Sequence, residues 1–115
     1  MKRLTAPNDR FQISIQRIWH SPAVQLDEEV ITCIQSAANR VVGEAGFMDT
    51  ISLAGHDSAL TALRVPTAMI FVPSKDGVSH APEEFTSEEE CGIGVQVLLE
   101  TALEYDSVLR SRHES

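Results

Sequence analysis

The sequence predicts an α/β fold, in which helices cover a sheet of parallel or mixed strands. Residues 11–16 alternate between apolar and polar side chains, which is typical of a half-buried strand. Residues 67–72 are almost continuously apolar, which is typical of a strand covered on both faces. Two longer segments, which begin near Asp27 and Ser87, repeat apolar residues every three or four positions, as amphipathic helices do. Strand and helix patterns therefore alternate along a chain long enough for one domain.

The first strand and the first helix are separated by a Ser-Pro break at residues 21–22. We expect the strand itself to extend to about residue 18. The helix pattern starts after Asp27, whose side chain is suited to an N-cap, and it ends near Gly43. Its apolar positions are Val30, Ile31, Ile34, Ala37, Ala38, Val41 and Val42.

The middle of the chain predicts two further strands and a short helix. Residues 47–52 predict a short strand, and residues 59–63 predict about one turn of helix. The apolar run at residues 67–72 predicts the next strand, which we expect inside a sheet because both of its faces are apolar.

The last helix is predicted to begin at Thr86 or Ser87. Glu89 stands three residues after Thr86, and Glu90 stands three residues after Ser87, so either pair is able to form a capping box. The apolar stripe of this helix consists of Cys91, Val95, Leu98, Leu99, Ala102, Leu103 and Leu109.

Composition and charge exclude several classes of function. The formal net charge of −8 argues against nucleic acid and against anionic membrane surfaces as partners. No apolar run has the length that a bilayer span requires, and no secretory signal is visible after Met1. Cys33 and Cys91 both fall on apolar helix stripes, so we expect buried free thiols rather than a disulfide. These features together predict a cytoplasmic location.

Two polar segments follow predicted strands, and both are candidate parts of a site. Residues 52–58 contain His56 and Asp57, and residues 74–87 contain His80. Ligands of open α/β sheets bind outside the carboxyl ends of the strands, so we expect both loops at one edge of the sheet.

His80 has two open interpretations. A neutral imidazole is a common metal ligand or general base, and Asp76, Glu83 or Glu84 is close enough in sequence to orient it. The alternative is a solvated loop histidine. The same alternatives apply to His56, where the neighbouring aspartate would then only cap the short helix.

A longer pattern runs through both loops. Its residues are Ser52, Ala54, Gly55, His56 and Asp57, then residues 69–74, and then Asp76, Gly77, Ser79, His80, Pro82, Glu84 and Thr86. In this order they resemble one end of the zinc-dependent amidohydrolases that include N-carbamoyl-L-amino-acid hydrolase and allantoate amidohydrolase. These are dinuclear metallohydrolases of the aminoacylase and carboxypeptidase type. Residues 18–24 also resemble the segment where the lid domain of that family returns the chain to the catalytic domain.

The resemblance implies a role for each candidate residue. His80 corresponds to the last metal ligand of a site for zinc or manganese, and Gly55 and His56 correspond to a loop that lines the substrate pocket. The residues that would support these two loops are Asp57, Asp76 and Ser79. The other metal ligands and the catalytic glutamate of the family have no counterpart here, so no catalytic residue is assigned. The chain also departs from the family pattern, most notably where Leu53 replaces a glycine in the substrate loop.

The resemblance further divides the chain into two parts. Residues 1–21 would be the last strand of a lid, or dimerisation, domain. Residues 22–115 would be the C-terminal part of a three-layer, zinc exopeptidase-like catalytic domain. The implied fold is therefore a partial metallohydrolase domain with one strand left from the lid.

Two functions follow from these expectations. The first is a part or subunit of a metal-dependent hydrolase that acts on linear C–N bonds of N-carbamoyl amino acids or allantoate. Its substrate would be a small ureido or carbamoyl molecule, and its partner would be the upstream half of a split enzyme. The second is a truncated, non-catalytic α/β protein that binds another chain, or itself, through exposed sheet edges. We expect a homo-oligomer, because the strand at residues 11–18 would have lost its partners in the lid.

Overall fold

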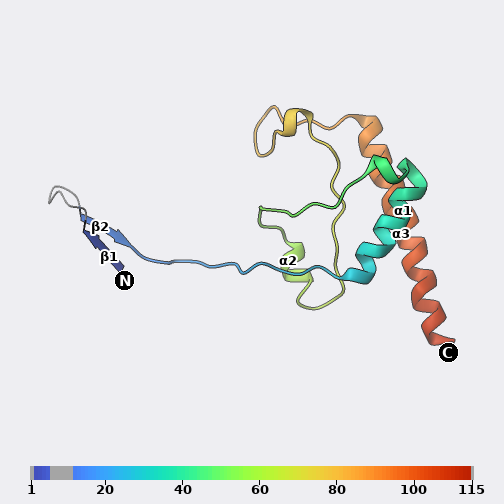
Figure 1. The fold of residues 1–115 in the computed structure, drawn as a ribbon, viewed down its shortest axis with the longest axis horizontal. Helices are drawn as coiled ribbons and strands as arrows, with labels where there is room; N and C mark the ends of the chain where they lie inside the picture. The colour runs from blue at the N-terminus through green and yellow to red at the C-terminus, as the bar shows by residue number, and fades with distance from the viewer. Residues whose placement is uncertain (1, 6–11, 115) are drawn as a thin grey trace.

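A computed structural model describes residues 2–5 and 12–114 of the chain (Figure 1). The elements are β1 (Lys2–Thr5), β2 (Gln12–Ile15), α1 (Glu28–Val42), η1 (Glu44–Gly46), α2 (Ser58–Thr61), η2 (Lys75–Gly77) and α3 (Glu88–His113). The two long helices, α1 and α3, lie side by side and run in opposite directions, and irregular segments that carry α2 and η2 lie on one side of them.

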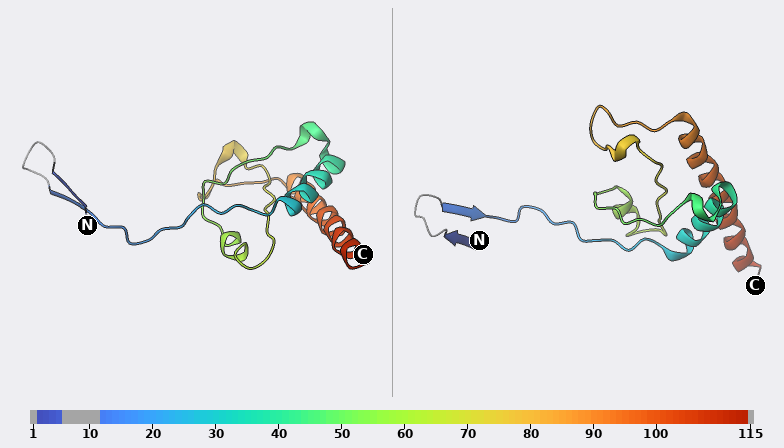
Figure 2. Two further views of the ribbon diagram at one scale, coloured as in Figure 1. Left: turned by 60° about the horizontal axis from the view of Figure 1, so that its bottom comes forward. Right: turned by 45° about the horizontal axis from the view of Figure 1, so that its top comes forward.

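The N-terminal strands form an antiparallel hairpin in which Lys2 pairs with Ile15 and Leu4 pairs with Ile13. The sequence predicts β2 but not β1, and the assignment of residues 1–21 to a lid domain stays a prediction. A four-residue strand with two basic residues carries no readable alternation, and it exists only because β2 supplies its hydrogen-bond partners. Phe11, which belongs to the predicted strand pattern, lies outside the described residues. In both views of Figure 2 the hairpin lies apart from the helices, at the end of an extended connection.

Both long helices begin where the sequence predicts. The Asp27 side chain accepts a hydrogen bond from the backbone N–H of Val30 at 2.9 Å, and α1 ends at Gly43, where φ is 78°. For α3 the structure selects Ser87: its hydroxyl accepts from the N–H of Glu90, whose side chain accepts in return from the N–H of Ser87. These pairs satisfy backbone donors that the first turn of a helix leaves open.

The core lies where α1 and α3 cross. The most buried side chains there are small, which lets the two helix backbones approach closely; they are Cys33, Ala37, Ala38, Val97 and Thr101. Ion pairs hold both ends of the crossing: Arg40 pairs with Glu104 at 2.7 Å, and Arg112 pairs with Glu29. Burial and the carboxylates of Glu104 and Glu29 raise the pKa of the Cys33 thiol, which therefore stays protonated at neutral pH. The expectation of a buried free thiol is confirmed for this cysteine.

The apolar stripe that the sequence assigns to α3 faces away from this core. Its members Val95, Leu98 and Leu103 are 66%, 59% and 60% exposed, and Cys91 is also exposed. The expectation that Cys91 is buried is therefore wrong. Apolar residues occur on more than one side of α3, and α1 covers the side that contains Val97 and Thr101.

The predicted strands at residues 47–52 and 67–72 do not form within the described part of the chain. A strand needs a neighbouring chain segment to accept and donate its backbone hydrogen bonds, and no described segment pairs with either one. The α2 turn between them forms as predicted. The three-layer arrangement is accordingly not built by the described residues, and the radius of gyration is 20.5 Å, against about 13 Å for a compact domain of similar length.

Candidate functional site

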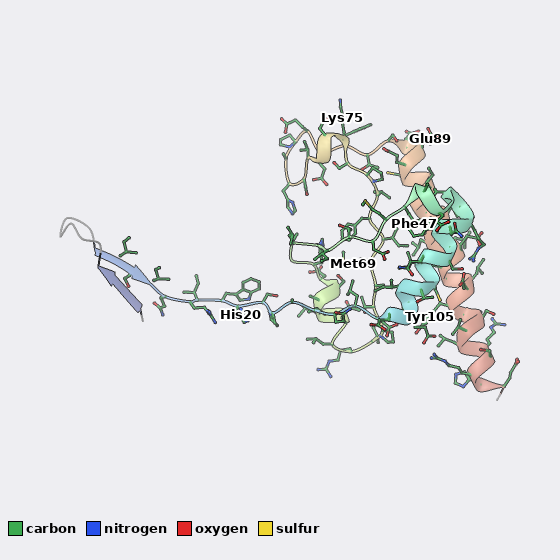
Figure 3. The ribbon with its side chains drawn as sticks, viewed as in Figure 1. His20, Phe47, Met69, Lys75, Glu89 and Tyr105 are labelled. Carbon is green, nitrogen blue, oxygen red and sulfur yellow. The ribbon has the colours of Figure 1, made fainter. Side chains whose placement is uncertain are left out.

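The loop that carries His80 is closed at its base by two hydrogen bonds. The N–H of Lys75 donates to the carbonyl of Phe85 at 2.8 Å, and the Thr86 hydroxyl donates to the carbonyl of Pro73 at 2.7 Å. Within the loop, the Ser74 hydroxyl donates to the carbonyl of Val78 at 2.5 Å. Figure 3 shows Lys75 on this loop near the top of the view, well above Tyr105 on α3.

His80 itself is held from two sides while its side chain stays exposed. Its backbone is left-handed, with φ of 58°, and its N–H donates to the carboxylate of Glu84 at 2.8 Å. Its ring nitrogen Nδ1 lies 2.8 Å from the Ser79 hydroxyl. Within the described residues, Nε2 of this ring has no hydrogen-bond partner. The imidazole is therefore oriented through one nitrogen and open at the other.

A second left-handed position precedes His80. Asp76 has φ of 55°, and Gly77 after it has φ of 67°. Aspartate, asparagine and histidine tolerate this backbone conformation better than most residues, and glycine adopts it freely. No hydrogen bond of the Asp76 carboxylate occurs among the described residues, so this residue shapes the loop through its backbone.

The other candidate loop holds His56 through a different set of contacts. Nε2 of His56 lies 2.7 Å from the Ser52 hydroxyl, and its ring meets the ring of Phe71 edge to face, with 5.7 Å between centroids. Asp57 occupies the N-cap position of α2, but its side chain makes no capping hydrogen bond. Leu53 is 99% exposed and so does not crowd the loop in this arrangement. A Cβ added at Gly55 would meet nothing within 4 Å.

Both loops are attached to the same segment, residues 67–73. Phe71 contacts His56, Sδ of Met69 accepts a hydrogen bond from the Ser58 hydroxyl at 2.8 Å, and the His80 loop follows directly at Ser74. No group of three His, Cys, Asp or Glu side chains that could hold a metal occurs among residues 2–5 and 12–114. The described chain thus offers one oriented imidazole in each loop and no complete metal site.

The sequence pattern alone assigns no role to Ser52, and it makes Glu84 one of several candidates for orienting His80. Each stands four residues from the histidine that it contacts, and each belongs to the sequence pattern that runs through both loops. The spacing was therefore visible, but only the folded turns show that it brings these atoms together.

An apolar cavity of about 560 Å³ lies between the long helices and residues 46–52 and 69–73. Side chains such as Ile34, Phe47, Ile70 and Val97 line it, and neither His56 nor His80 does. Figure 3 shows Phe47 beside the helices, where it packs against their core. Ser52, Phe71 and Pro73 also line the cavity, so it reaches the bases of both histidine loops.

Comparison with known proteins identifies the family of this chain. The sequence pattern of peptidase family M20/M25/M40 matches residues 7–104. The chain belongs to this family. It is 42% identical to the allantoate amidohydrolase of Bacillus subtilis over 77 aligned residues. This alignment covers 65% of the chain and 18% of that protein. It is 40% identical to the N-carbamoyl-L-amino acid amidohydrolase of Geobacillus stearothermophilus over 70 aligned residues. This alignment covers 59% of the chain and 17% of that protein.

A further relative is the allantoate amidohydrolase of Escherichia coli, which is 51% identical over 75 residues, 65% of this chain and 18% of that protein. The chain therefore spans less than a fifth of the length of these curated relatives. No solved structure matches it. The resemblance to the amidohydrolase family is confirmed, and membership of family M20/M25/M40 implies an α/β metallohydrolase fold, of which the described residues form a part. Among the described residues, no helix has both the length and the apolar character that crossing a membrane requires.

Proposed function

We propose that this chain is a C-terminal portion of a metal-dependent hydrolase that cleaves linear C–N bonds in N-carbamoyl amino acids or allantoate. Its His80 binds one divalent metal ion, zinc or manganese, and the loop with Gly55 and His56 lines the substrate pocket. The activities after which these relatives are named support this substrate class. Residues 22–115 would belong to the catalytic domain, and the hairpin within residues 1–21 would belong to a lid.

The observation that carries the proposal is the geometry at His80. Left-handed backbone at a non-glycine residue is unfavourable, and it occurs often at functional sites. Here the Glu84 carboxylate fixes that backbone through the N–H of His80, and the Ser79 hydroxyl occupies Nδ1. Metal-binding histidines usually donate one ring N–H to a neighbouring oxygen while the other nitrogen binds the ion. The donor set at His80 fits that arrangement, with Nε2 as the ligand atom.

A divalent cation at this position would polarise the carbonyl oxygen of a ureido or carbamoyl group and make a bound water more acidic. A catalytic zinc usually needs three protein ligands, and this chain supplies one. The remaining ligands would come from the upstream part of the enzyme. The role of the residues described here is to hold one ligand nitrogen in place and, through His56, to present a hydrogen-bonding group to the substrate.

A chimera tests the proposal. Residues 22–115 would replace the matching segment of the Bacillus subtilis allantoate amidohydrolase, and ammonia release from allantoate would be measured with added manganese or zinc. We expect metal-dependent turnover that His80→Ala reduces at least 100-fold, together with weaker metal binding measured by calorimetry. The matched control is His113→Ala, which removes a histidine at the end of α3 and leaves both loops intact.

The isolated 115-residue chain gives the baseline of the same assay, because it lacks most of the ligands, and we expect it to stay at background. A folded chimera in which His80→Ala retains full activity and full metal binding would contradict the proposal. Metal-dependent turnover by the isolated chain would contradict the assignment of the missing ligands to another segment.

A further inference from the structure

The Ser52 hydroxyl makes several contacts within the loop at residues 52–58. It accepts a hydrogen bond from the N–H of Ala54 at 3.3 Å, it lies 3.4 Å from the carbonyl oxygen of Ala54, and it lies 2.7 Å from Nε2 of His56. A serine hydroxyl has one proton to donate and two lone pairs that accept. The carbonyl oxygen and Nε2 therefore compete for a single proton.

The distances decide which acceptor receives that proton. Hydrogen bonds donated by a hydroxyl are typically about 2.7–2.8 Å long, whereas those that an N–H donates to oxygen are typically about 2.9–3.0 Å long. The contact with Nε2, at 2.7 Å, has the length of a hydroxyl-donated bond, and the carbonyl of Ala54, at 3.4 Å, is a poor alternative. The Ser52 hydroxyl therefore donates to Nε2 of His56. A neutral imidazole that accepts through Nε2 carries its proton on Nδ1.

The orientation of the His56 ring is fixed by the same contact. A ring turned over would place the carbon Cε1 close to the present position of Nε2, 2.7 Å from the Ser52 hydroxyl, whereas carbon–oxygen contacts of this kind lie at about 3.3–3.6 Å. The edge-to-face contact with Phe71 holds the half-buried ring from another side. Among the described residues, no hydrogen bond reaches Nδ1 of His56. Its N–H is therefore able to donate to a further partner.

Ser79 and His80 form a pair of a different kind. The Ser79 hydroxyl lies 2.8 Å from Nδ1 of His80, and it makes no other hydrogen bond in the part of the chain that the structure describes. This hydroxyl is free to accept the proton of Nδ1, which leaves Nε2 as the basic nitrogen that a metal ion needs. The two loops thus hold their histidines through opposite ring nitrogens, His80 through Nδ1 and His56 through Nε2.

We propose that Ser52 is a positioning residue that holds His56 in its Nδ1–H form, so that His56 donates a hydrogen bond to an acceptor oxygen of the substrate. The identity of the substrate rests on the proposed function: N-carbamoyl amino acids and allantoate offer carbonyl and carboxylate oxygens. A site built to donate a hydrogen bond discriminates strongly against a molecule that lacks the acceptor, because the buried donor is then left unpaired. Ser52 therefore acts on substrate selection through His56, without touching the substrate itself.

NMR of the imidazole nitrogens in the full chain tests the tautomer without substrate or metal. The chain has four histidines, and the signals of His56 are those missing from His56→Ala. At about pH 8.5, where an ordinary imidazole is neutral, we expect the Nδ1–H pattern for His56. Ser52→Ala removes the donor and is expected to shift the ratio of tautomers by about fivefold toward Nε2–H, the usual weight of one hydrogen bond.

Two further variants separate the hydroxyl from a general disturbance of the loop. Ser52→Thr keeps a hydroxyl at this position and should retain the wild-type pattern of His56. Ser79→Ala is the matched control, because it is expected to change the signals of His80 and to leave those of His56 unchanged. An Nε2–H pattern for His56 in the wild-type chain, or a wild-type ratio of tautomers in Ser52→Ala, would overturn the assignment.

The chimera with the Bacillus subtilis enzyme tests the donor role. We expect Ser52→Ala to lower kcat/KM for allantoate by about tenfold and to leave the affinity for the metal ion unchanged, while Ser52→Thr retains most of the activity. Full activity of Ser52→Ala would overturn the donor role. If the chimera showed no turnover at all, the proposed function would fail and the donor role with it, whereas the NMR spectra of the full chain would still decide the tautomer of His56.

Discussion

The two long helices and the two extended segments beside them differ in where their backbone hydrogen bonds come from. In α1 and α3 the bonds lie within each helix, and Asp27 and Ser87 complete the first turns. Residues 47–52 and 67–72 have few such bonds; one is the N–H of Asp27 that donates to the carbonyl of Thr67 at 2.9 Å. All four segments are rich in apolar residues, so hydrophobicity alone does not explain why only the helices are regular.

The difference shows which structures the described residues form without further chain segments. A helix needs only its own residues to satisfy its backbone, and it needs one neighbour to bury an apolar stripe. A strand needs a second segment for every backbone bond that it makes. The helical pair is therefore expected to be the stable unit of this chain, and the sheet region is expected to gain order only when partner strands are supplied.

The largest effect is expected from filling the helix crossing. Ala37 is fully buried between α1 and α3, so Ala37→Leu adds three carbon atoms where no space exists. We expect the free energy of unfolding to fall by about 1–3 kcal/mol. Urea unfolding followed by circular dichroism measures this. The control Ala45→Leu, at an exposed position in η1, should change it by less than about 0.5 kcal/mol. Equal effects at the two positions would show that the crossing is not the stable unit.

Two alanine substitutions in α3 test whether residues 67–73 pack against this helix. Their effects on the free energy of unfolding are expected to be smaller and to differ between Gly92 and Gly94. A Cβ added at Gly94 would lie 2.5 Å from Cγ1 of Val72, whereas one added at Gly92 would meet nothing within 4 Å. Alanine gains about 1 kcal/mol of helix propensity over glycine at either position. We expect Gly92→Ala to stabilise the chain by about that amount.

At Gly94 the overlap costs about 1–3 kcal/mol, so Gly94→Ala is expected to be neutral or destabilising by up to about 2 kcal/mol. The same urea titration reports both variants. If Gly94→Ala stabilises as much as Gly92→Ala, then Val72 does not rest on α3 in solution.

The smallest effect is a pH dependence at the start of α3. Hydrogen bonds from the side chain and the backbone of Ser87 lower the pKa of Glu90 below its ordinary value of 4.5. The charged form is thus favoured in the folded state, so its stabilising contribution is present above pH 4.5 and is lost as the pH falls through the lowered pKa. Glu90→Gln should flatten the stability profile in that acidic window, and Glu89→Gln should not. If stability depends on pH in the same way for both variants, the capping box does not cause the pH dependence.

The sequence predicted the helices well because their signals are local. Asp27, Gly43 and the Ser87–Glu90 pair lie within a few residues of the helix ends that they define, and each was found in place. It predicted the wrong buried side for α3, because an apolar stripe marks a surface that needs cover without showing which partner is present. The sequence favours the longer stripe, with Leu98 and Val95, whereas α1 covers the side with Val97.

The site was predictable as two loops and not as a set of contacts. The histidines and their loops could be named from the pattern in the sequence, and their roles in metal and substrate binding stay predictions. The contacts between Glu84 and His80 and between Ser52 and His56 depend on turns that close only in the folded chain. β1 was missed because its partner strand, rather than its own composition, makes it a strand.

The closure of the His80 loop has a consequence for how this part of the chain folds. The bonds that shape it join residues no more than 13 apart in sequence, so the entropy lost in closing it is small and closure does not wait for distant contacts. Most of the information for the position of this histidine is therefore encoded within about fourteen consecutive residues. A segment of this kind is able to form its native loop early in folding. Because its contacts are local, one short stretch of coding sequence is enough to transfer the loop to another protein.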